Sequence, residues 1–305
     1  MKVIHVMTKN TEGVYDLNSN ILSETVSFLS VLKWKSFGFT TKIYVDEYFK
    51  ELYTKIGLLD LYDEVDDTFF VDNDLYAQYN IGKHYFWAFS KIFIYLNEPD
   101  PFIMSDMDFI PLQDFHQYLD NSFIYYKESL SDKITYPDKE NLICAKDYTY
   151  PEWFTWNVLP TNTAICYINN TELKNLYVQE AIRYAQNNTD EYEDDNENFR
   201  QQIFIPRMVF AEQRMLPEVA NHLGIELKEI KNNYEMIINE REMHLFIYKQ
   251  GGERWLLYFL DKLNKEFPEV YSKLIELEAY SEIKAKIETE GFIYEIPKML
   301  KRTNW

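Results

Sequence analysis

Apolar and polar positions follow one another along the N-terminal part of the chain in blocks that predict alternating strands and helices. Residues 3–7 are a short apolar strand that ends in the polar residues 8–10. Four apolar residues then recur at helical spacing: Leu22, Val26, Leu29 and Leu32. Asn20 or Ser23 is the expected N-cap of this helix, and Gly38 is the residue expected to end it.

A second strand at residues 42–45 and a second helix at residues 46–58 continue the pattern. The order strand, helix, strand, helix predicts a parallel sheet that is covered on both faces. A third helix is predicted over residues 82–96, because four apolar residues form one stripe along it: Tyr85, Phe89, Ile92 and Leu96. Residues 102–104 are uniformly apolar and predict a buried strand.

The remainder of the chain continues the mixture of strands and helices. Strands are predicted at residues 123–126, 163–168, 225–230 and 243–248, and helices at residues 172–186, 204–224 and within 255–301. Pro217 is expected to kink the second of these helices. Residues 132–158 predict a long loop, and long loops in compact domains are often functional.

Composition and charge narrow the class of protein. The chain has 305 residues, which fits one α/β domain with helical additions. The net charge of −19 argues against nucleic acid as a partner, since phosphate backbones are bound by clustered Lys and Arg. A small phosphorylated ligand remains compatible with this charge, because one metal ion reverses the field locally. The aromatic content of 17% suits sugar binding, although an AT-rich genome explains most of it.

The location of the protein is expected to be cytoplasmic. The N-terminus runs directly into a strand and lacks the apolar stretch of a signal peptide, and no apolar run reaches transmembrane length. Cys144 and Cys166 are expected to be reduced thiols, since no CxxC pair or disulfide framework is present.

Two carboxylates carry the chemistry that the sequence predicts. Asp106 and Asp108 directly follow the buried strand at residues 102–104. Side chains alternate along a strand, so residues at i and i+2 are expected to project to the same side. Ligands of α/β sheets gather beyond the carboxyl ends of the strands, and paired oxygen ligands suit Mg²⁺ or Mn²⁺. The pattern therefore predicts a metal site, with a polar turn at a strand end as the alternative.

The residues around this pair resemble a known family. The segments AFSKIFIY at residues 88–95 and PFIMSDMDF at residues 101–109 are similar to the core of GT-A glycosyltransferases. The similarity is greatest to glycogenin-like enzymes, to bacterial lipopolysaccharide or capsule galactosyl- and glucosyltransferases, and to bacterial GT-A-like proteins with W-A-x-x-K-I before D-x-D. It covers about the first three quarters of the chain.

The resemblance implies an α/β fold of the GT-A type. This is a Rossmann-like, nucleotide-diphospho-sugar transferase domain with a mixed sheet flanked by helices. It would occupy residues 1–250, and residues 251–305 would form a C-terminal helical extension. Pro297 to Trp305 combine basic residues with apolar ones, so a peripheral contact with an anionic membrane surface is one interpretation and a frayed tail is the other.

The same resemblance implies roles for residues around the carboxylates. Lys91 matches a basic residue that reaches the nucleotide or the donor phosphate, unless it is a surface lysine. Asn162 takes the place of an Asn-rich strand that touches donor and acceptor, or lies in a plain core strand. Glu212, which Gln213 follows, matches an acidic residue that faces the reacting carbon. It is a candidate for acceptor binding or base catalysis, or a solvated helix carboxylate.

Further residues complete the site that the resemblance implies. His244 would be the third metal ligand beside Asp106 and Asp108, and Lys249 would contact the diphosphate. The glycine of the usual H-x-x-G-x-K pattern is absent here, and the alternative for His244 is a place in the core. Met7 and Thr8 would lie near the nucleotide base, and Asp46 near the ribose or the base.

The expected function is a metal-dependent glycosyltransferase. It would use Mn²⁺ or Mg²⁺ and move a hexose from a nucleoside diphosphate sugar, in particular a UDP-sugar, to a glycan or a lipid-linked acceptor. One alternative is a sugar-nucleotide nucleotidyltransferase, although the Gly- and Arg-rich loop of that class is missing after the first strand. The other alternative is a catalytically inactive carbohydrate-binding or scaffold protein on the same fold.

Overall fold

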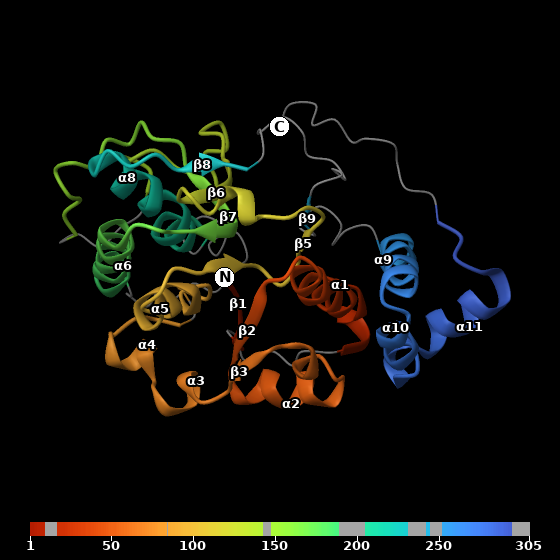
Figure 1. The fold of residues 1–305 in the computed structure, drawn as a ribbon. Coiled ribbons are helices and arrows are strands. Elements are labelled where there is room, and N and C mark those ends of the chain that lie inside the picture. The colour runs from red at the N-terminus through yellow and green to blue at the C-terminus, as the bar shows by residue number, and fades with distance from the viewer. Residues whose placement is uncertain are drawn as a thin grey trace.

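The computed structural model describes residues 1–9, 17–83, 85–142, 148–188, 205–230, 242–244 and 252–294. Its centre is a seven-stranded sheet with the order β3-β2-β1-β4-β7-β6-β8 (Figure 1). The strands of this sheet are β1 (Lys2–Met7), β2 (Thr40–Val45), β3 (Glu64–Asp66), β4 (Ile103–Ser105), β6 (Phe123–Lys127), β7 (Thr161–Tyr167) and β8 (Lys228–Glu229). A separate pair joins β5 (Phe109–Pro111) to β9 (Glu242–His244).

The sheet is mixed, which confirms the expected fold class. Strands β3, β2, β1 and β4 are parallel, as the repeated strand-helix units predict. Strand β7 is antiparallel to both β4 and β6. The carboxyl ends of β1, β2, β4 and β6 therefore lie at the same edge as the amino end of β7, and we call this the ligand edge.

The helices cover both faces of the sheet (Figure 1). They are α1 (Leu17–Ser36), α2 (Glu47–Lys55), α3 (Phe69–Asp72), α4 (Leu75–Gln78), α5 (Ser90–Asn97), α6 (Thr171–Gln186), α8 (Met215–His222), α9 (Glu253–Glu266), α10 (Pro268–Leu274) and α11 (Ser281–Glu290). Short 3₁₀ turns lie at Leu59–Leu61, His116–Tyr118 and Glu278–Tyr280, and a π-helical turn lies at Phe210–Arg214.

Alternate residues of the strands enter different parts of the core. In β2, Tyr44 packs into a cluster with α5, α6 and α8, whereas Ile43 and Val45 pack into a cluster with α1, α2 and α9. In β1, Val3 and Ile4 also belong to different clusters, and both are fully buried. The strands read as continuous apolar runs because both faces of the sheet are covered.

The C-terminal helices contribute to this same core. Helix α9 lies beside α1 (Figure 1). Its residues Leu257, Phe259 and Leu260 join the cluster that contains Ile43 and Val45. The prediction of helices within residues 255–301 is confirmed, while a domain boundary at residue 250 stays a prediction. None of the helices in the described ranges combines the length and the hydrophobicity that crossing a bilayer requires.

The structure corrects two predicted helix starts. The helix predicted over residues 82–96 begins only at Ser90, because the described residues before it, 82–83 and 85–89, lie in turns that bury Tyr85, Phe86 and Phe89 in the core. Gly82 is needed in these turns, since a Cβ atom there would lie 2.7 Å from the Tyr85 ring. Helix α1 begins at Leu17, so Asn20 and Ser23 lie inside it rather than at its N-cap.

Other local predictions hold or are refined. Gly38 follows α1 with a φ of 83°, a left-handed conformation that glycine adopts without strain. Residues 205–222 are helical, as predicted, but the irregularity lies at the π-helical turn Phe210–Arg214 rather than at Pro217, which sits in regular α8. Residues 132–158 contain no helix or strand in their described part, as the loop prediction requires.

We predict that α9 stabilises the whole fold. Replacing the fully buried Phe259 by Ala should lower the free energy of unfolding by about 3–5 kcal/mol, because it leaves a cavity in the shared core. Urea unfolding followed by circular dichroism measures this loss. Arg254→Ala, at an exposed position of the same helix, is the control and should change stability by less than about 0.5 kcal/mol. A single transition with unchanged midpoint for Phe259→Ala would contradict the packing.

Candidate active site

The ligand edge carries Asp106 at the end of β4. The Asp106 amide donates to the Ala164 carbonyl at 2.7 Å, which anchors the residue to the neighbouring strand β7. The Phe109 amide then donates to the Asp106 carbonyl at 3.1 Å and closes a turn over residues 106–109. The expected strand alternation of Asp106 and Asp108 is therefore wrong, because the strand ends at Ser105 and both carboxylates belong to the turn.

A lysine ammonium joins this turn to a second carboxylate. Lys91 Nζ, on α5, lies 2.5 Å from Asp106 Oδ1 and 2.8 Å from Glu212 Oε1. The Lys91 side chain is 16% exposed, and that of Glu212 is only 7% exposed. Burial by itself would lower the pKa of Lys91, but the adjacent charges of Asp106 and Glu212 and their hydrogen bonds raise it above its ordinary value. Lys91 is therefore a fixed positive charge at neutral pH.

The π-helical turn places Glu212 in this position. Thr163 on β7 donates its hydroxyl to Glu212 Oε1 at 2.8 Å, and the Tyr177 hydroxyl of α6 donates to the Glu212 carbonyl at 2.9 Å. The Thr161 hydroxyl donates to the Gln213 carbonyl at 3.0 Å. Side chains thus satisfy carbonyls in the widened turn, and single π turns of this kind recur at functional sites.

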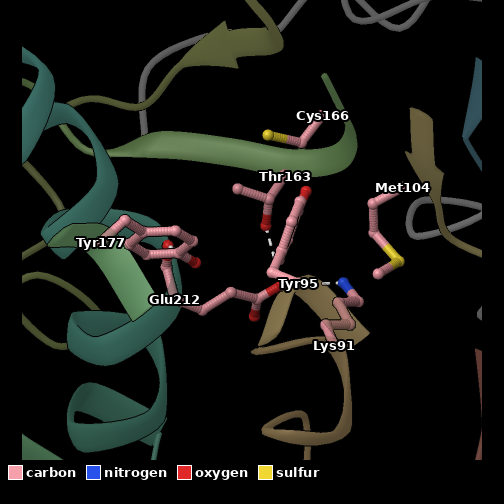
Figure 2. Close-up of a pocket in the computed structure, with 7 residues that line it drawn as sticks. All are labelled: Lys91, Tyr95, Met104, Thr163, Cys166, Tyr177 and Glu212. Atoms are coloured by element: carbon pink, nitrogen blue, oxygen red, sulfur yellow. Dashed lines mark hydrogen bonds and ion pairs between the residues drawn. The ribbon is translucent and has the colours of Figure 1, made fainter. Parts of the chain in front are cut away.

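A small cavity of about 10 Å³ lies behind Glu212 and Lys91, which is room for one water molecule. Figure 2 shows Cys166 and Tyr177 among the side chains that line it. Burial raises the pKa of the Cys166 thiol to about 12, so the group stays protonated at neutral pH. Cys166 is thereby excluded as a nucleophile in this setting, because only the thiolate is reactive.

Asn162 lies at the same edge but turns to other partners. Its amide nitrogen donates to Glu128 Oε1 at 3.1 Å and to the Tyr126 hydroxyl at 3.2 Å. Its side-chain oxygen accepts from the Ala164 amide at 3.0 Å. The sequence reasoning did not find Glu128, because nothing near it in the sequence indicates that β6 and β7 bring it beside Asn162.

The residues expected near the nucleotide lie at the ends of β1 and β2. Asp46 caps α2 through the Phe49 amide at 3.0 Å and also accepts from the Lys9 amide at 2.5 Å. Thr8 is buried, and Met7 packs against the cluster of α1 and α2. Asp46 therefore holds the loop after β1 against the start of α2, and its role toward a ribose or a base stays a prediction.

A buried polar network supports the turn of Asp106 and Asp108 from inside the protein. The Ser30 hydroxyl donates to the Phe109 carbonyl at 2.6 Å, and His5 Nε2 lies 3.4 Å from the same hydroxyl oxygen. His5 Nδ1 lies 2.7 Å from the Tyr62 hydroxyl, whose oxygen is 3.5 Å from the Met107 sulfur. Since Ser30 gives its proton to the carbonyl, Nε2 is the donor and Nδ1 the acceptor in this arrangement.

Two charged residues, Arg214 and Glu218, hold the long loop at residues 132–158 in place. Glu218 accepts from the amides of Thr155 and Trp156, both at 2.9 Å, while Arg214 donates to the Trp156 carbonyl at 2.7 Å. The Arg214 guanidinium also lies over the Trp156 ring at 4.8 Å. This clamp holds Trp156 at a φ of 64°, a left-handed conformation that is costly for a residue with a side chain.

The described side chains contain no group of three His, Cys, Asp or Glu residues that could together hold a metal ion. Asp106 and Asp108 supply oxygen donors, which fit Mn²⁺ or Mg²⁺. The backbone of His244 is described, and it pairs with Phe109, the residue after Asp108. The His244 side chain and Lys249 lie outside the described residues, so their expected roles stay predictions.

No protein-family model matches the sequence, and no curated protein is similar to it at a significant level. Two solved structures are similar in overall architecture. Mouse xyloside xylosyltransferase 1, in its apo form, has a TM-score of 0.43 and 9% identity, over 76% of this chain and 86% of that chain. The PaToxG glycosyltransferase has a TM-score of 0.30 and 11% identity, over 93% of this chain and 86% of that chain. At these TM-scores and identities, the two similarities do not assign an activity to this chain. The activity is inferred below from the residues of the site.

We predict that His5 makes the stability depend on pH. Burial lowers its pKa from 6.5 to about 3, so below pH 6.5 the unfolded chain binds a proton at His5 that the folded chain does not. The contribution of His5 to the free energy of unfolding should fall by about 1.4 kcal/mol per pH unit as the pH decreases below that value. Urea unfolding between about pH 6.5 and 5 measures the slope.

The matched variants for this measurement are His5→Gln and His222→Gln. His5→Gln should remove most of the slope, because the titrating group is gone. His222 is exposed, so His222→Gln should keep the slope of the unmodified protein. Equal slopes for the unmodified protein and His5→Gln would show that His5 is not held neutral by the fold.

Proposed function

We propose that the protein is a metal-dependent glycosyltransferase that moves a hexose from a nucleoside diphosphate sugar, in particular a UDP-sugar, to a glycan or lipid-linked acceptor. One observation carries the proposal. At the ligand edge, the Asp106 carboxylate lies beside a lysine ammonium at 2.5 Å, and the same ammonium holds the carboxylate of Glu212. Acidic, basic and hydrogen-bonding groups thus converge where α/β sheets bind their ligands.

Asp106 and Asp108 would hold the metal ion, with His244 as the proposed third ligand. A divalent cation bound there supplies charge neutralisation for the diphosphate that leaves the sugar. The carboxylate of Asp106 is 25% exposed, which leaves it accessible to a cation from solvent. Lys91 and Lys249 would add positive charge for the diphosphate, so the binding of an anion to this acidic protein becomes favourable.

Glu212 is the proposed acceptor-side residue. Thr163 and Lys91 hold Glu212 Oε1, and the π-helical turn fixes its backbone, so the carboxylate is positioned before any substrate binds. Such a carboxylate accepts a hydrogen bond from an acceptor hydroxyl and increases its nucleophilicity. Asn162 would orient the sugar or the acceptor from the neighbouring strand, and Met7, Thr8 and Asp46 would border the nucleotide.

The same geometry also favours a second candidate function, a catalytically inactive carbohydrate-binding or scaffold protein. Lys91 pairs with both carboxylates, as a lysine in a structural ion pair does. A nucleotidyltransferase has no such observation in its favour. A cytoplasmic location also remains a proposal, as does membrane contact through residues 297–305, which lie outside the described part of the chain.

We predict that UDP binds in a metal-dependent manner. Isothermal titration should show UDP binding in the presence of Mn²⁺ that weakens by at least about a hundredfold without the metal. Asp106→Asn and Asp108→Asn should each abolish the metal-dependent part, because the variants remove an anionic ligand. Asp114→Asn, at an exposed position after β5, is the control and should bind UDP normally. Metal-independent binding of sugar without UDP would favour the scaffold function instead.

We predict that Glu212 acts in turnover rather than in donor binding. Slow transfer of the sugar to water provides an assay that requires no known acceptor, since a screen of nucleotide sugars reports the released nucleotide. At saturating Mn²⁺, Glu212→Gln should lower this turnover by about 10²- to 10⁴-fold while it retains metal-dependent UDP binding. Glu226→Gln, at an exposed position after α8, is the matched control with unchanged turnover. Full turnover in Glu212→Gln would contradict the proposed role.

A further inference from the structure

We propose that Lys91 is a built-in counter-cation, which neutralises Asp106 when no metal is bound and gives this carboxylate up when a metal ion binds. This inference rests on the proposed function and extends it to the order of events in the site. It makes the lysine ammonium and the divalent ion competitors for one carboxylate. The binding of metal would then change the partner of Lys91 as well as the charge of the site.

The Lys91 ammonium occupies a position close to the proposed metal site. Lys91 Nζ lies 2.5 Å from Asp106 Oδ1, within direct contact of a proposed metal ligand (Figure 2 shows Lys91 facing Glu212). A divalent cation that bonds to Asp106 would lie close to the lysine ammonium, and the two positive charges would repel each other. Movement of the ammonium away from Asp106 relieves this repulsion.

Of its two carboxylate partners, Lys91 should keep Glu212 and release Asp106. Glu212 is the more buried partner, with a side-chain exposure of 7% against 25% for Asp106. An ion pair is less screened by solvent when it is more buried. Breaking the pair of Lys91 with Glu212 therefore costs more free energy than breaking its pair with Asp106. Thr163 also holds Glu212 Oε1 in place at 2.8 Å, whereas Asp106 lies in a partly exposed turn. Asp106 would therefore be the carboxylate that binds the metal ion, and Lys91 would stay on Glu212.

A lysine side chain is flexible enough to change its partner. Its ammonium has three N–H donors on a flexible four-carbon stem, so a shift of the charge requires rotation of side-chain bonds alone. Within the described residues, Asp106 and Glu212 accept two of these donors. The donor that Asp106 releases becomes available to an oxygen of the diphosphate. Metal binding would thus prepare Lys91 for the nucleotide, which predicts that metal binds before the donor sugar.

The experiment measures Mn²⁺ alone, without nucleotide, by titration followed with electron paramagnetic resonance of free Mn²⁺. Lys91→Met removes the competing charge and should bind Mn²⁺ about tenfold more tightly than the unmodified protein. Glu212→Gln removes the second anchor of Lys91, so the ammonium stays on Asp106 and Mn²⁺ should bind several-fold more weakly. The two variants therefore shift the affinity in opposite directions, which a general loss of structure would not do.

The matched control is Lys35→Met. It removes the same charge from an exposed ion pair with Asp63, whose N–O distance is 2.7 Å, and it should leave the Mn²⁺ affinity within about twofold of the unmodified protein. Any larger effect of Lys91→Met is then local. Thermal unfolding of each variant confirms that the binding is measured on folded protein. If Lys91→Met does not fold, the exchange is tested by whether Glu212→Gln binds Mn²⁺ more weakly than the unmodified protein.

The outcomes separate this inference from the proposed function. Equal or weaker Mn²⁺ binding by Lys91→Met, with normal binding by the unmodified protein, overturns the exchange and leaves the metal-dependent transferase standing. Equal or tighter binding by Glu212→Gln overturns it as well. If the unmodified protein binds no Mn²⁺ even with UDP present, the proposed metal site fails, and the exchange fails with it.

Discussion

The ion pairs of Lys91 with Asp106 and Glu212 are the interaction on which the arrangement of the site depends. They join three elements that are distant in sequence: helix α5, the turn after β4 and the π-helical turn before α8. A largely buried charge is costly unless it is paired, and removal of one partner of a buried ion pair typically costs about 3–5 kcal/mol. The three charges therefore stabilise one another, and none of them is independent of the others.

The rest of the structure holds these charges in place. On one side of the turn, Ser30 and His5 connect the Phe109 carbonyl to the buried interior. On the other side, Thr163 and the antiparallel strand β7 hold Glu212. The change of strand direction at β7 matters here, because it brings the amino end of that strand to the carboxyl end of β4. A site that is positioned before its ligand binds loses less entropy when the ligand arrives.

Much of the fold could be predicted from the sequence, because the signals are local. Apolar runs at β1, β2 and β4 and the glycine after α1 report buried strands and a helix end directly. The prediction that a helix begins at residue 82 was wrong, because the aromatic residues there lie in turns and pack into the core. Tertiary packing overrides helical periodicity in this segment. The strand geometry predicted at Asp106 and the regular helix predicted at Glu212 were wrong for the same reason. Side-chain contacts from other elements decide the backbone geometry at both places.

The site itself could be predicted only in part. Asp106 was selected by its position after a buried strand, and Lys91 and Glu212 by resemblance. Their meeting depends on the contact of Lys91 with Glu212, 121 positions away, which no local pattern encodes. Glu128 and the network of His5 have no sequence signal at all. The metal site is tested most directly by anomalous diffraction from a crystal soaked with Mn²⁺ and UDP. We expect a manganese peak bonded to the carboxylates of Asp106 and Asp108, next to the diphosphate. A peak elsewhere, with Lys91 still paired to Asp106 and both carboxylates away from the nucleotide, would contradict it.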